Sequence, residues 1–220
     1  MYRGETIRVS ALHDGFVELC FDRAGDPVNR FDSRTVAELG QAVAVIAAAP
    51  GVRGVLATSA KDVFIVGADI PELREKLKWP HAELVADVRA GNEIFVLLED
   101  FPFPTVAAID GYALGGGFEF ALACALRAMS HQARVGLPEV NLGVFPGFGG
   151  TVRSVRTKRR WRIERSMQPA RATRCVPRHS TCCAARRTAG STGGPPSSAS
   201  AMRFRSSRRA GPCSAACVTR

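Results

Sequence analysis

The composition of the chain changes abruptly near residue 153, and this change limits which part of it can fold. Residues 1–153 contain 14 Lys and Arg against 19 Asp and Glu, a net charge of −5, whereas residues 154–220 contain 16 against 1, a net charge of +15. The second part is rich in Ser, Thr, Ala, Gly, Pro, Arg and Cys and has no sustained helical or strand period. Such a segment buries too little apolar surface to offset its ordering entropy, about 1–2 kcal/mol per residue. We therefore predict one folded domain over residues 1–153 and a disordered, basic, low-complexity tail over residues 154–220.

The net charge of +10 belongs to this tail and not to the predicted domain. A basic protein suggests nucleic-acid binding, but the domain itself is mildly acidic, so we expect no specific nucleic-acid site on it. An Arg-rich tail attracts phosphates through charge alone. A basic arm with an evolved binding role therefore stays open as an alternative.

The cysteines and the N-terminus indicate the compartment. Cys20 and Cys124 lie in apolar surroundings, as expected of buried thiols in a reduced protein. The tail cysteines have neither CxxC spacing nor histidine pairs, so no metal site is expected. No signal peptide is visible at the N-terminus, and no run approaches 18 apolar residues. We predict a cytoplasmic protein without a membrane span.

Strand and helix patterns alternate along the first 153 residues. Strands are expected at TIRVSAL and FVELCFD, which form a hairpin around HDG, and at VRGVLATS, VFIV, TVAAIDG, RAMS and RVGL. Helices are expected over RTVAELGQAVAVIAAAP (capped by Asp32 or Ser33), from Pro71, from His81 to Glu99, and over FEFALACAL. This order predicts an α/β domain built of ββα-like units.

The stretch DGYALGGGFEFALA, residues 110–123, breaks two local rules, as functional sites tend to do. It places three consecutive glycines after a predicted strand, and it places Glu119 between two phenylalanines. A helix that begins near Gly116 would point unpaired N–H groups outward, with the positive end of the helix dipole behind them. Glu119 would lie on the same side of the first turn. A donor for a negative oxygen and a proton-transferring carboxylate would then be neighbours.

A second carboxylate, Glu139, follows in GLPEVNLG. Two carboxylates in one apolar pocket can take different pKa values and divide acid and base work, although spacing alone does not bring these two together. Purely structural interpretations also stay open. The glycines are compatible with close helix–strand packing, Glu119 with a partly exposed helix position, Glu139 with a loop, and Asp69 with a cap or turn.

Three motifs, taken together, resemble the enoyl-CoA hydratase/isomerase, or crotonase, superfamily. They are FIVGADI (64–70), IDGYALGGGFE (109–119) and LPEVNLGVFPGFGGT (137–151), in the family's order and spacing. The start of the chain is more similar still to the N-terminal hydratase/isomerase part of the α subunits of fatty-acid oxidation complexes. The resemblance covers residues 1–153. It implies a crotonase-like superhelix of ββα units that is incomplete at its C-terminus.

The resemblance implies a lyase that hydrates 2-enoyl-CoA thioesters in fatty-acid β-oxidation, with isomerase activity on 3-enoyl-CoA as well. The backbone N–H groups of Ala68 and Gly116 would form the oxyanion hole, Glu119 would activate water, and Glu139 would protonate C2. The substrate-binding residues that it implies are Gly67, Ala68, Asp69, Ile70, Gly115 and Gly117. It implies no cofactor, because coenzyme A is part of the substrate and the NAD-binding part of longer members is absent. The implied partners are the acyl-CoA substrate and either a second copy of the chain or a thiolase subunit.

The resemblance stops after GFGGT, where the family continues with amphipathic helices that complete the pocket. Here a run that begins TVRSVRTKRRWRIER replaces them. We interpret residues 154–220 as the product of a shifted reading frame, since Arg, Ala, Gly, Pro, Ser and Cys are typical of GC-rich DNA read out of frame. The alternative to an active enzyme is therefore a catalytically inactive remnant whose tail binds polyanions non-specifically.

Overall fold

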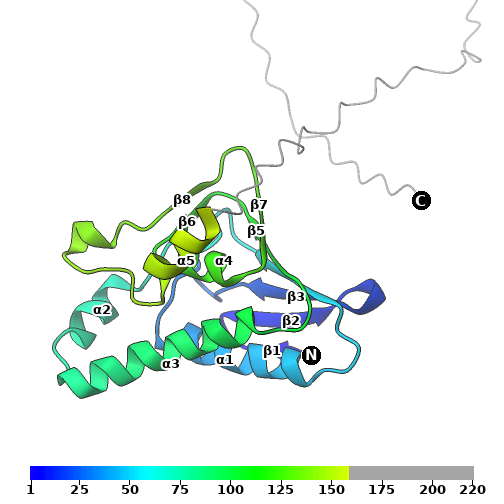
Figure 1. Cartoon of the computed structure of the whole chain (residues 1–220), viewed down its shortest axis with the longest axis horizontal. Coiled ribbons are helices and arrows are strands. Elements are labelled where there is room, and N and C mark those ends of the chain that lie inside the picture. Colours follow the sequence, from blue (N-terminus) through cyan, green and yellow to red (C-terminus); the bar gives the residue numbers. More distant parts are fainter. Residues whose placement is uncertain (159–220) are drawn as a thin grey trace, which may run out of the picture. The chain divides into compact units, whose positions relative to one another are not determined.

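A six-stranded mixed sheet forms the centre of the part of the chain that the structure, a computed structural model, describes, residues 1–158 (Figure 1). Its first three strands pair antiparallel, and the pairs from the third strand onward are parallel. In spatial order the strands are β1 (Tyr2–Arg3), β2 (Ile7–Ala11), β3 (Phe16–Phe21), β4 (Gly54–Ser59), β5 (Thr105–Ile109) and β7 (Leu126–Met129).

The predicted N-terminal hairpin is confirmed. Strands β2 and β3 pair in a register that places Ile7 opposite Phe21, and both side chains are buried. The connection contains a short 3₁₀ turn, η1 (His13–Gly15), in which Asp14 has a φ of 57°. Asp is one of the few residues that adopt this left-handed conformation readily, which is why HDG serves as the turn.

Helix α1 (Ser33–Ala48) begins at the predicted cap. The Asp32 side chain accepts a hydrogen bond from the N–H of Thr35 at 2.8 Å, and this satisfies one of the free donors of the first turn. Leu39, Val43 and Ile46 recur at helical spacing and are buried. The helix ends before Pro50, two residues earlier than the predicted segment, because a residue that precedes proline disfavours helical geometry.

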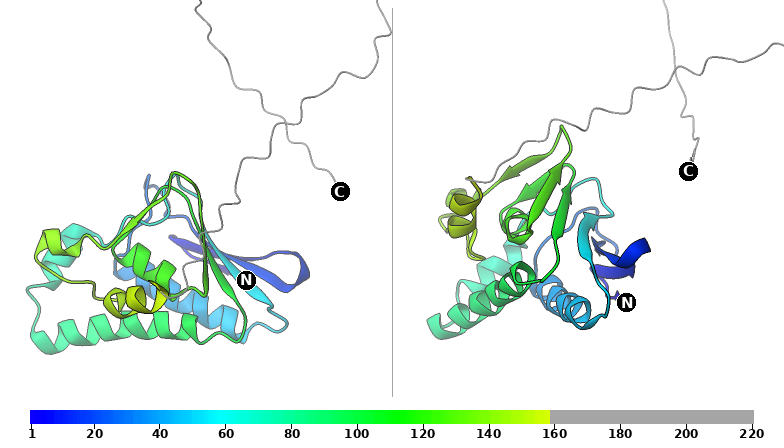
Figure 2. Two further views of the ribbon diagram at one scale, coloured as in Figure 1. Left: turned by 45° about the horizontal axis from the view of Figure 1, so that its top comes forward. Right: turned by 45° about the vertical axis from the view of Figure 1, so that its right-hand side comes forward.

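Helices α2 (Ile70–Lys76) and α3 (His81–Glu99) follow the fourth strand, and α3 has the predicted bounds. Asp69 caps α2 by accepting a hydrogen bond from the N–H of Glu72 at 3.0 Å. The helix therefore begins one residue before the predicted Pro71. In the views of Figure 2, α1 and α3 run alongside each other, and the two helices are in contact.

The predicted strand at VFIV, residues 63–66, is wrong. Only Ile65 forms a β-bridge, with Ala113. The N–H groups of Phe64 and Ile65 both donate to the carbonyl oxygen of Tyr112, at 3.0 and 3.1 Å, so the chain bends at this point and no ladder develops. A short apolar run does not distinguish a strand from such a buried bend.

A second, two-stranded parallel sheet leads into the glycine-rich stretch. It pairs β6 (Tyr112–Leu114) with β8 (Arg134–Gly136). Helix α4 (Gly116–Ala123) follows β6 directly, and all of its residues are buried. The 3₁₀ helix η2 (Glu139–Leu142) follows β8. These short elements carry the predicted site residues.

The core beside α4 is a cluster of phenylalanine rings. Ring centroids of neighbouring pairs lie 5.1 to 6.5 Å apart, mostly with tilted or edge-to-face geometry, which is favourable for aromatic pairs. The cluster consists of Phe21, Phe31, Phe64, Phe95 and Phe120. It fixes α4 against the main sheet and α3.

Helix α5 (Gly150–Lys158) crosses the boundary that composition predicted at residue 153. Ser154 to Lys158 thus continue a helix that began in the domain, which corrects the expectation that helical structure ends there. The rest of the predicted tail, residues 159–220, lies outside the described residues. Within residues 1–158 no helix is long and apolar enough to cross a membrane.

Candidate active site

A cavity of about 560 Å³ brings together most of the residues that the sequence singled out. It lies among the segment before α2, the starts of α4 and η2, and one side of α3. The predicted residues that line it are Gly67, Ala68, Asp69, Ile70, Gly115, Gly116, Glu119 and Glu139. Most of its other lining side chains are apolar, among them Phe31, Leu73, Leu77, Leu84, Val88, Val144 and Phe148. Such a cavity suits an apolar ligand that a few polar groups orient.

The backbone geometry around Ala68 leaves its N–H group free. Ala68 forms a parallel β-bridge with Phe31, in which Phe31 N–H donates to Gly67 O and Asp69 N–H donates to Phe31 O, both at 2.8 Å. In extended backbone, alternate residues point their polar groups to opposite sides. The Ala68 N–H therefore points away from Phe31, and it has no hydrogen-bond acceptor in the described part of the chain.

Gly115 places the start of α4 beside the second predicted carboxylate. Its φ of 51° and ψ of −127° are closed to other residues, and its N–H donates to Gly136 O at 2.9 Å. A Cβ atom at this position would lie 3.0 Å from Oε1 of Glu139. The next residue, Gly116, is the first of the helix, and its N–H has no acceptor among residues 1–158. It is therefore available to an external oxygen.

Gly117 differs from its two neighbours because it does not line the cavity. A Cβ atom there would lie 2.4 Å from the carbonyl oxygen of Ile65. This glycine allows α4 to approach the Ile65 bridge closely. The structure therefore supports the packing interpretation for Gly117 and not the substrate contact that the resemblance implied.

Glu119 is a buried carboxylate with one strong hydrogen bond. Only 2% of the residue is exposed, and its Oε1 accepts a hydrogen bond from the N–H of Gly150 at 2.7 Å. Its pKa is raised from 4.5 to about 7, chiefly by burial and also by the nearby charge of Glu139, and the hydrogen bond from Gly150 limits the rise. Glu119 therefore titrates near neutral pH, where a side chain can both accept and donate a proton.

Glu139 approaches the same cavity from η2. Its Oε2 is buried and has no hydrogen-bond partner within the described residues. Burial raises the pKa of this carboxyl group as well. Buried polar atoms are nearly always paired in folded proteins, so an unpaired carboxylate oxygen on a cavity wall indicates a place for a ligand or water. The cavity therefore holds two carboxyl groups, of which one can be protonated while the other is ionised.

The segment that precedes α5, whose Gly150 donates to Glu119, is held by residues that sequence reasoning missed. Asn92 of α3 donates to Gly147 O at 2.6 Å, and Arg153 of α5 donates to Phe148 O and pairs with Glu99 at 2.8 Å. Only 6% of Arg153 is exposed. No local pattern separates it from the basic residues that follow, because its partner lies 54 positions earlier.

Comparison with known proteins places this geometry in a family. A family model described as enoyl-CoA hydratase/isomerase matches residues 14–174, more than half of the chain. The chain belongs to the enoyl-CoA hydratase/isomerase family. The match confirms the family that the three motifs predicted, and it extends past the boundary predicted at residue 153.

Relatives within the enoyl-CoA hydratase/isomerase family include subunits of fatty acid oxidation complexes. The chain is 56% identical over 153 residues to the fatty acid oxidation complex subunit alpha of Pseudomonas putida (strain GB-1) and to that of Pseudomonas syringae pv. tomato. The matched part is 70% of this chain and 21% of either relative. The chain thus spans about a fifth of the length of these relatives.

Solved structures of the family confirm the crotonase-like fold. An enoyl-CoA hydratase from Bacillus anthracis is 30% identical with a TM-score of 0.61, over 69% of this chain and 57% of that one. An enoyl-CoA hydratase from Geobacillus kaustophilus is 31% identical with a TM-score of 0.64, over 70% and 57%. The α/β arrangement described above is therefore that of the family, and it corresponds to 57% of each of these two solved chains.

Proposed function

We propose that this chain carries the hydratase/isomerase site of fatty-acid β-oxidation and adds water to 2-enoyl-CoA thioesters. The observation that carries the proposal is the convergence on one apolar cavity of two carboxyl groups with raised pKa values and two backbone N–H groups that find no acceptor within residues 1–158. The apolar walls suit an acyl chain. The names of the similar proteins, an enoyl-CoA hydratase and a fatty acid oxidation complex subunit, support the same reaction class.

The two N–H groups would bind the thioester carbonyl. When water adds to C3 of the enoyl group, the electrons of the double bond shift toward this carbonyl, and its oxygen becomes negative. Ala68 and Gly116 donate to that oxygen, and the start of α4 adds the positive end of a helix dipole. Each such donor lowers the barrier by roughly 2.7–4 kcal/mol in other enzymes.

The two glutamates would divide the proton transfers. Glu119, as the carboxylate, takes a proton from the attacking water while the water oxygen bonds to C3. Glu139, as the acid, gives its proton to C2, so that one water is added in total and one proton passes from Glu119 back to Glu139 before the next cycle. In the isomerase reaction the same pair removes a proton from C2 of a 3-enoyl thioester and returns one to C4.

The remaining expectations are proposals that follow from the family. We propose that no separate cofactor takes part, that the protein acts in the cytoplasm, and that a second copy or a thiolase subunit is its partner. An inactive remnant that binds polyanions through residues 154–220 is the competing proposal. It depends on residues that lie mostly outside the described part of the chain.

Replacement of Glu139 by Gln tests the proposal. Glu139→Gln keeps the shape of the side chain but removes the acidic proton that it would give to C2. Hydration of crotonyl-CoA is therefore expected to fall by at least about 100-fold while binding of the CoA ester persists. The matched control is Glu75→Gln, which removes an exposed carboxylate that pairs with Lys78 outside the cavity, and it should keep full activity.

Two results would count against this proposal. Unchanged turnover in Glu139→Gln would remove Glu139 from the reaction. A parent protein that binds the CoA ester but hydrates none of it would favour the inactive remnant.

A further inference from the structure

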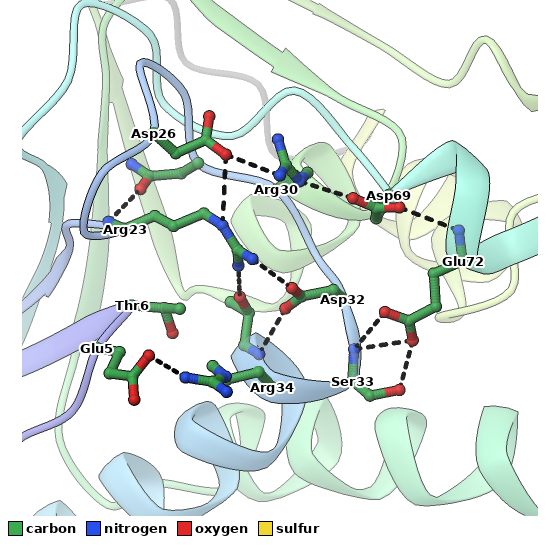
Figure 3. A network of polar contacts seen from close by, with 12 residues as sticks. Glu5, Thr6, Arg23, Asp26, Arg30, Asp32, Ser33, Arg34, Asp69 and Glu72 are labelled. Atoms are coloured by element: carbon green, nitrogen blue, oxygen red, sulfur yellow. Dashed lines mark hydrogen bonds and ion pairs between the residues drawn. The ribbon is translucent and has the colours of Figure 1, made fainter.

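A network of charged side chains borders the segment that carries the Ala68 N–H (Figure 3). Arg30 lies between two carboxylates in this network. Its Nη2 lies 2.7 Å from Asp26, and its Nε lies 2.7 Å from Asp69, an ion-pair distance at which the Nε–H group is not aligned for a hydrogen bond. Asp26 in turn contacts Arg23, which pairs with Asp32 at 2.6 Å. The catalytic scheme proposed above uses none of these side chains.

The backbone around Arg30 is the support against which the Ala68 segment is aligned. Asn29 O accepts a hydrogen bond from Val66 N–H at 3.0 Å, and Phe31 exchanges two bonds with Gly67 and Asp69. Arg30 is the residue between these contact points. The ion pair between the Arg30 side chain and Asp69 therefore joins the two backbone segments at the point where they pair.

Asp69 connects the same ion pair to Ala68. It is the next residue along the chain, it lines the cavity, and its other oxygen caps α2 through the N–H of Glu72 at 3.0 Å. The side chains of Arg30 and Asp69 are 30% and 20% exposed, so water screens their contact only in part. The ion pair and the cap together hold Asp69 from both sides.

We propose that Arg30 is a positioning residue for the oxyanion hole, an inference that rests on the proposed function. The Arg30–Asp69 pair fixes the direction of the Ala68 N–H, and it neutralises a carboxylate next to the place where negative charge develops on the thioester oxygen. Both effects act more strongly on the transition state than on the bound substrate. Loss of the guanidinium is therefore expected to reduce kcat by between about 10- and 100-fold with a small change in KM.

The experiment measures the polarisation of a bound thioester directly. The probe is 2,4-hexadienoyl-CoA, whose absorption band moves to longer wavelength when its carbonyl accepts hydrogen bonds. The full chain, Arg30→Gln and Arg30→Lys are each saturated with the probe. The control is Arg34→Gln, which removes an exposed arginine that pairs with Glu5 away from the cavity.

The parent protein and Arg34→Gln are expected to shift the band equally. Arg30→Gln should lose at least half of this shift although the probe remains bound, and Arg30→Lys, which keeps the charge, should recover part of it. A purely structural role would lower the amount of probe bound and leave the wavelength of the bound fraction unchanged. If Arg30→Gln does not fold, Asp26→Asn removes the outer anchor of Arg30, together with the longer contact of Asp26 to Arg23, and is expected to reduce the shift.

The outcomes separate this inference from the proposed function. If the absorption band of the bound probe shifts fully in Arg30→Gln, the positioning role is overturned and the hydratase proposal stays intact. The same holds for Asp26→Asn if Arg30→Gln does not fold. A parent protein that fails to bind the probe, or binds it without a shift, overturns the oxyanion hole and the role of Arg30 with it.

Discussion

Glu119 shows how one residue can be costly for the fold and still be kept. It lies between Phe118 and Phe120 in a fully buried helix, where ionisation is unfavourable. The hydrogen bond from Gly150 favours the charged form, but desolvation outweighs it, because the net effect is a pKa of about 7. The same burial that makes the residue useful for proton transfer therefore lowers the stability of the folded protein near neutral pH.

The stability cost of Glu119 is expected to depend on pH. The folded pKa is about 7 against an ordinary value of 4.5, so the contribution of the neutral group is fully present below pH 4.5 and is lost as pH rises through 7. The difference corresponds to about 3 kcal/mol. Glu119→Gln, which stays neutral, should be more stable than the parent by up to about 3 kcal/mol at pH 8, and by less than about 1 kcal/mol at pH 5.

Urea unfolding of the two proteins at both pH values measures this difference, with Glu75→Gln as the exposed counterpart. A stability gain of the same size at pH 5 and pH 8 would show that Glu119 titrates normally in the folded state.

At the level of elements, the site depends on how closely short segments approach one another. The start of α4 meets the Ile65 bridge on one side and η2 on the other. Gly117 permits the first contact and Gly115 the second. The three consecutive glycines therefore serve two purposes, since one allows packing and two border the cavity.

Gly117→Ala tests the packing contact. Alanine favours a helix over glycine by about 1 kcal/mol, but here its Cβ would lie 2.4 Å from a backbone oxygen that cannot move freely. Overpacking of this kind costs typically about 1–3 kcal/mol, so we expect a net loss of stability of that order. In the control Gly136→Ala, the nearest atom to the new Cβ is Leu114 Cδ2 at 3.9 Å, an ordinary contact.

Thermal or urea unfolding of both variants provides the comparison. Equal stability of Gly117→Ala and Gly136→Ala would mean that α4 can shift away from Ile65 without penalty.

For the whole molecule, the uneven distribution of charge predicts a behaviour unrelated to the cavity. Residues 154–220 carry a net charge of +15, whereas the cavity walls include Asp32, Asp69, Glu72 and Asp87 and one basic residue, Lys76, among the described residues. Lys76 is paired with Asp87 at 2.9 Å. Polyanions such as DNA should therefore be attracted to the basic residues 154–220 and not to the acidic cavity walls.

Duplex DNA of arbitrary sequence is expected to bind the full chain in a strongly salt-dependent way. If the protein makes six to ten phosphate contacts, raising the salt concentration from 50 to 200 mM should weaken its affinity for DNA by roughly 10³- to 10⁵-fold. Saturating DNA should leave hydration of crotonyl-CoA unchanged. A titration at two salt concentrations measures this. Binding that is insensitive to salt, or that selects one DNA sequence, would instead indicate an evolved nucleic-acid site.

Local chemistry determined much of this protein from the sequence alone. The caps Asp32 and Asp69, the bounds of α3 and the N-terminal hairpin were predictable because each depends on residues a few positions apart. The same holds for the start of α4 at Gly116, which made Glu119 conspicuous. The prediction failed at VFIV, where the carbonyl of the distant Tyr112 accepts both N–H groups, and at residues 154–158, which continue α5 past the boundary predicted from composition.

Only the tertiary structure decided what surrounds the two carboxylates. Glu139 lies against Gly115 at a sequence separation that no spacing rule covers, and the hydrogen-bond donor to Glu119 comes from Gly150. Arg30 contacts Asp69 because the Phe31–Ala68 β-bridge brings two distant segments together. The raised pKa of Glu119 likewise exists only once the phenylalanine core excludes water. Hydrogen bonds and charges act over a few ångströms in space, and desolvation increases with burial, so these properties arise only when distant parts of the chain pack together.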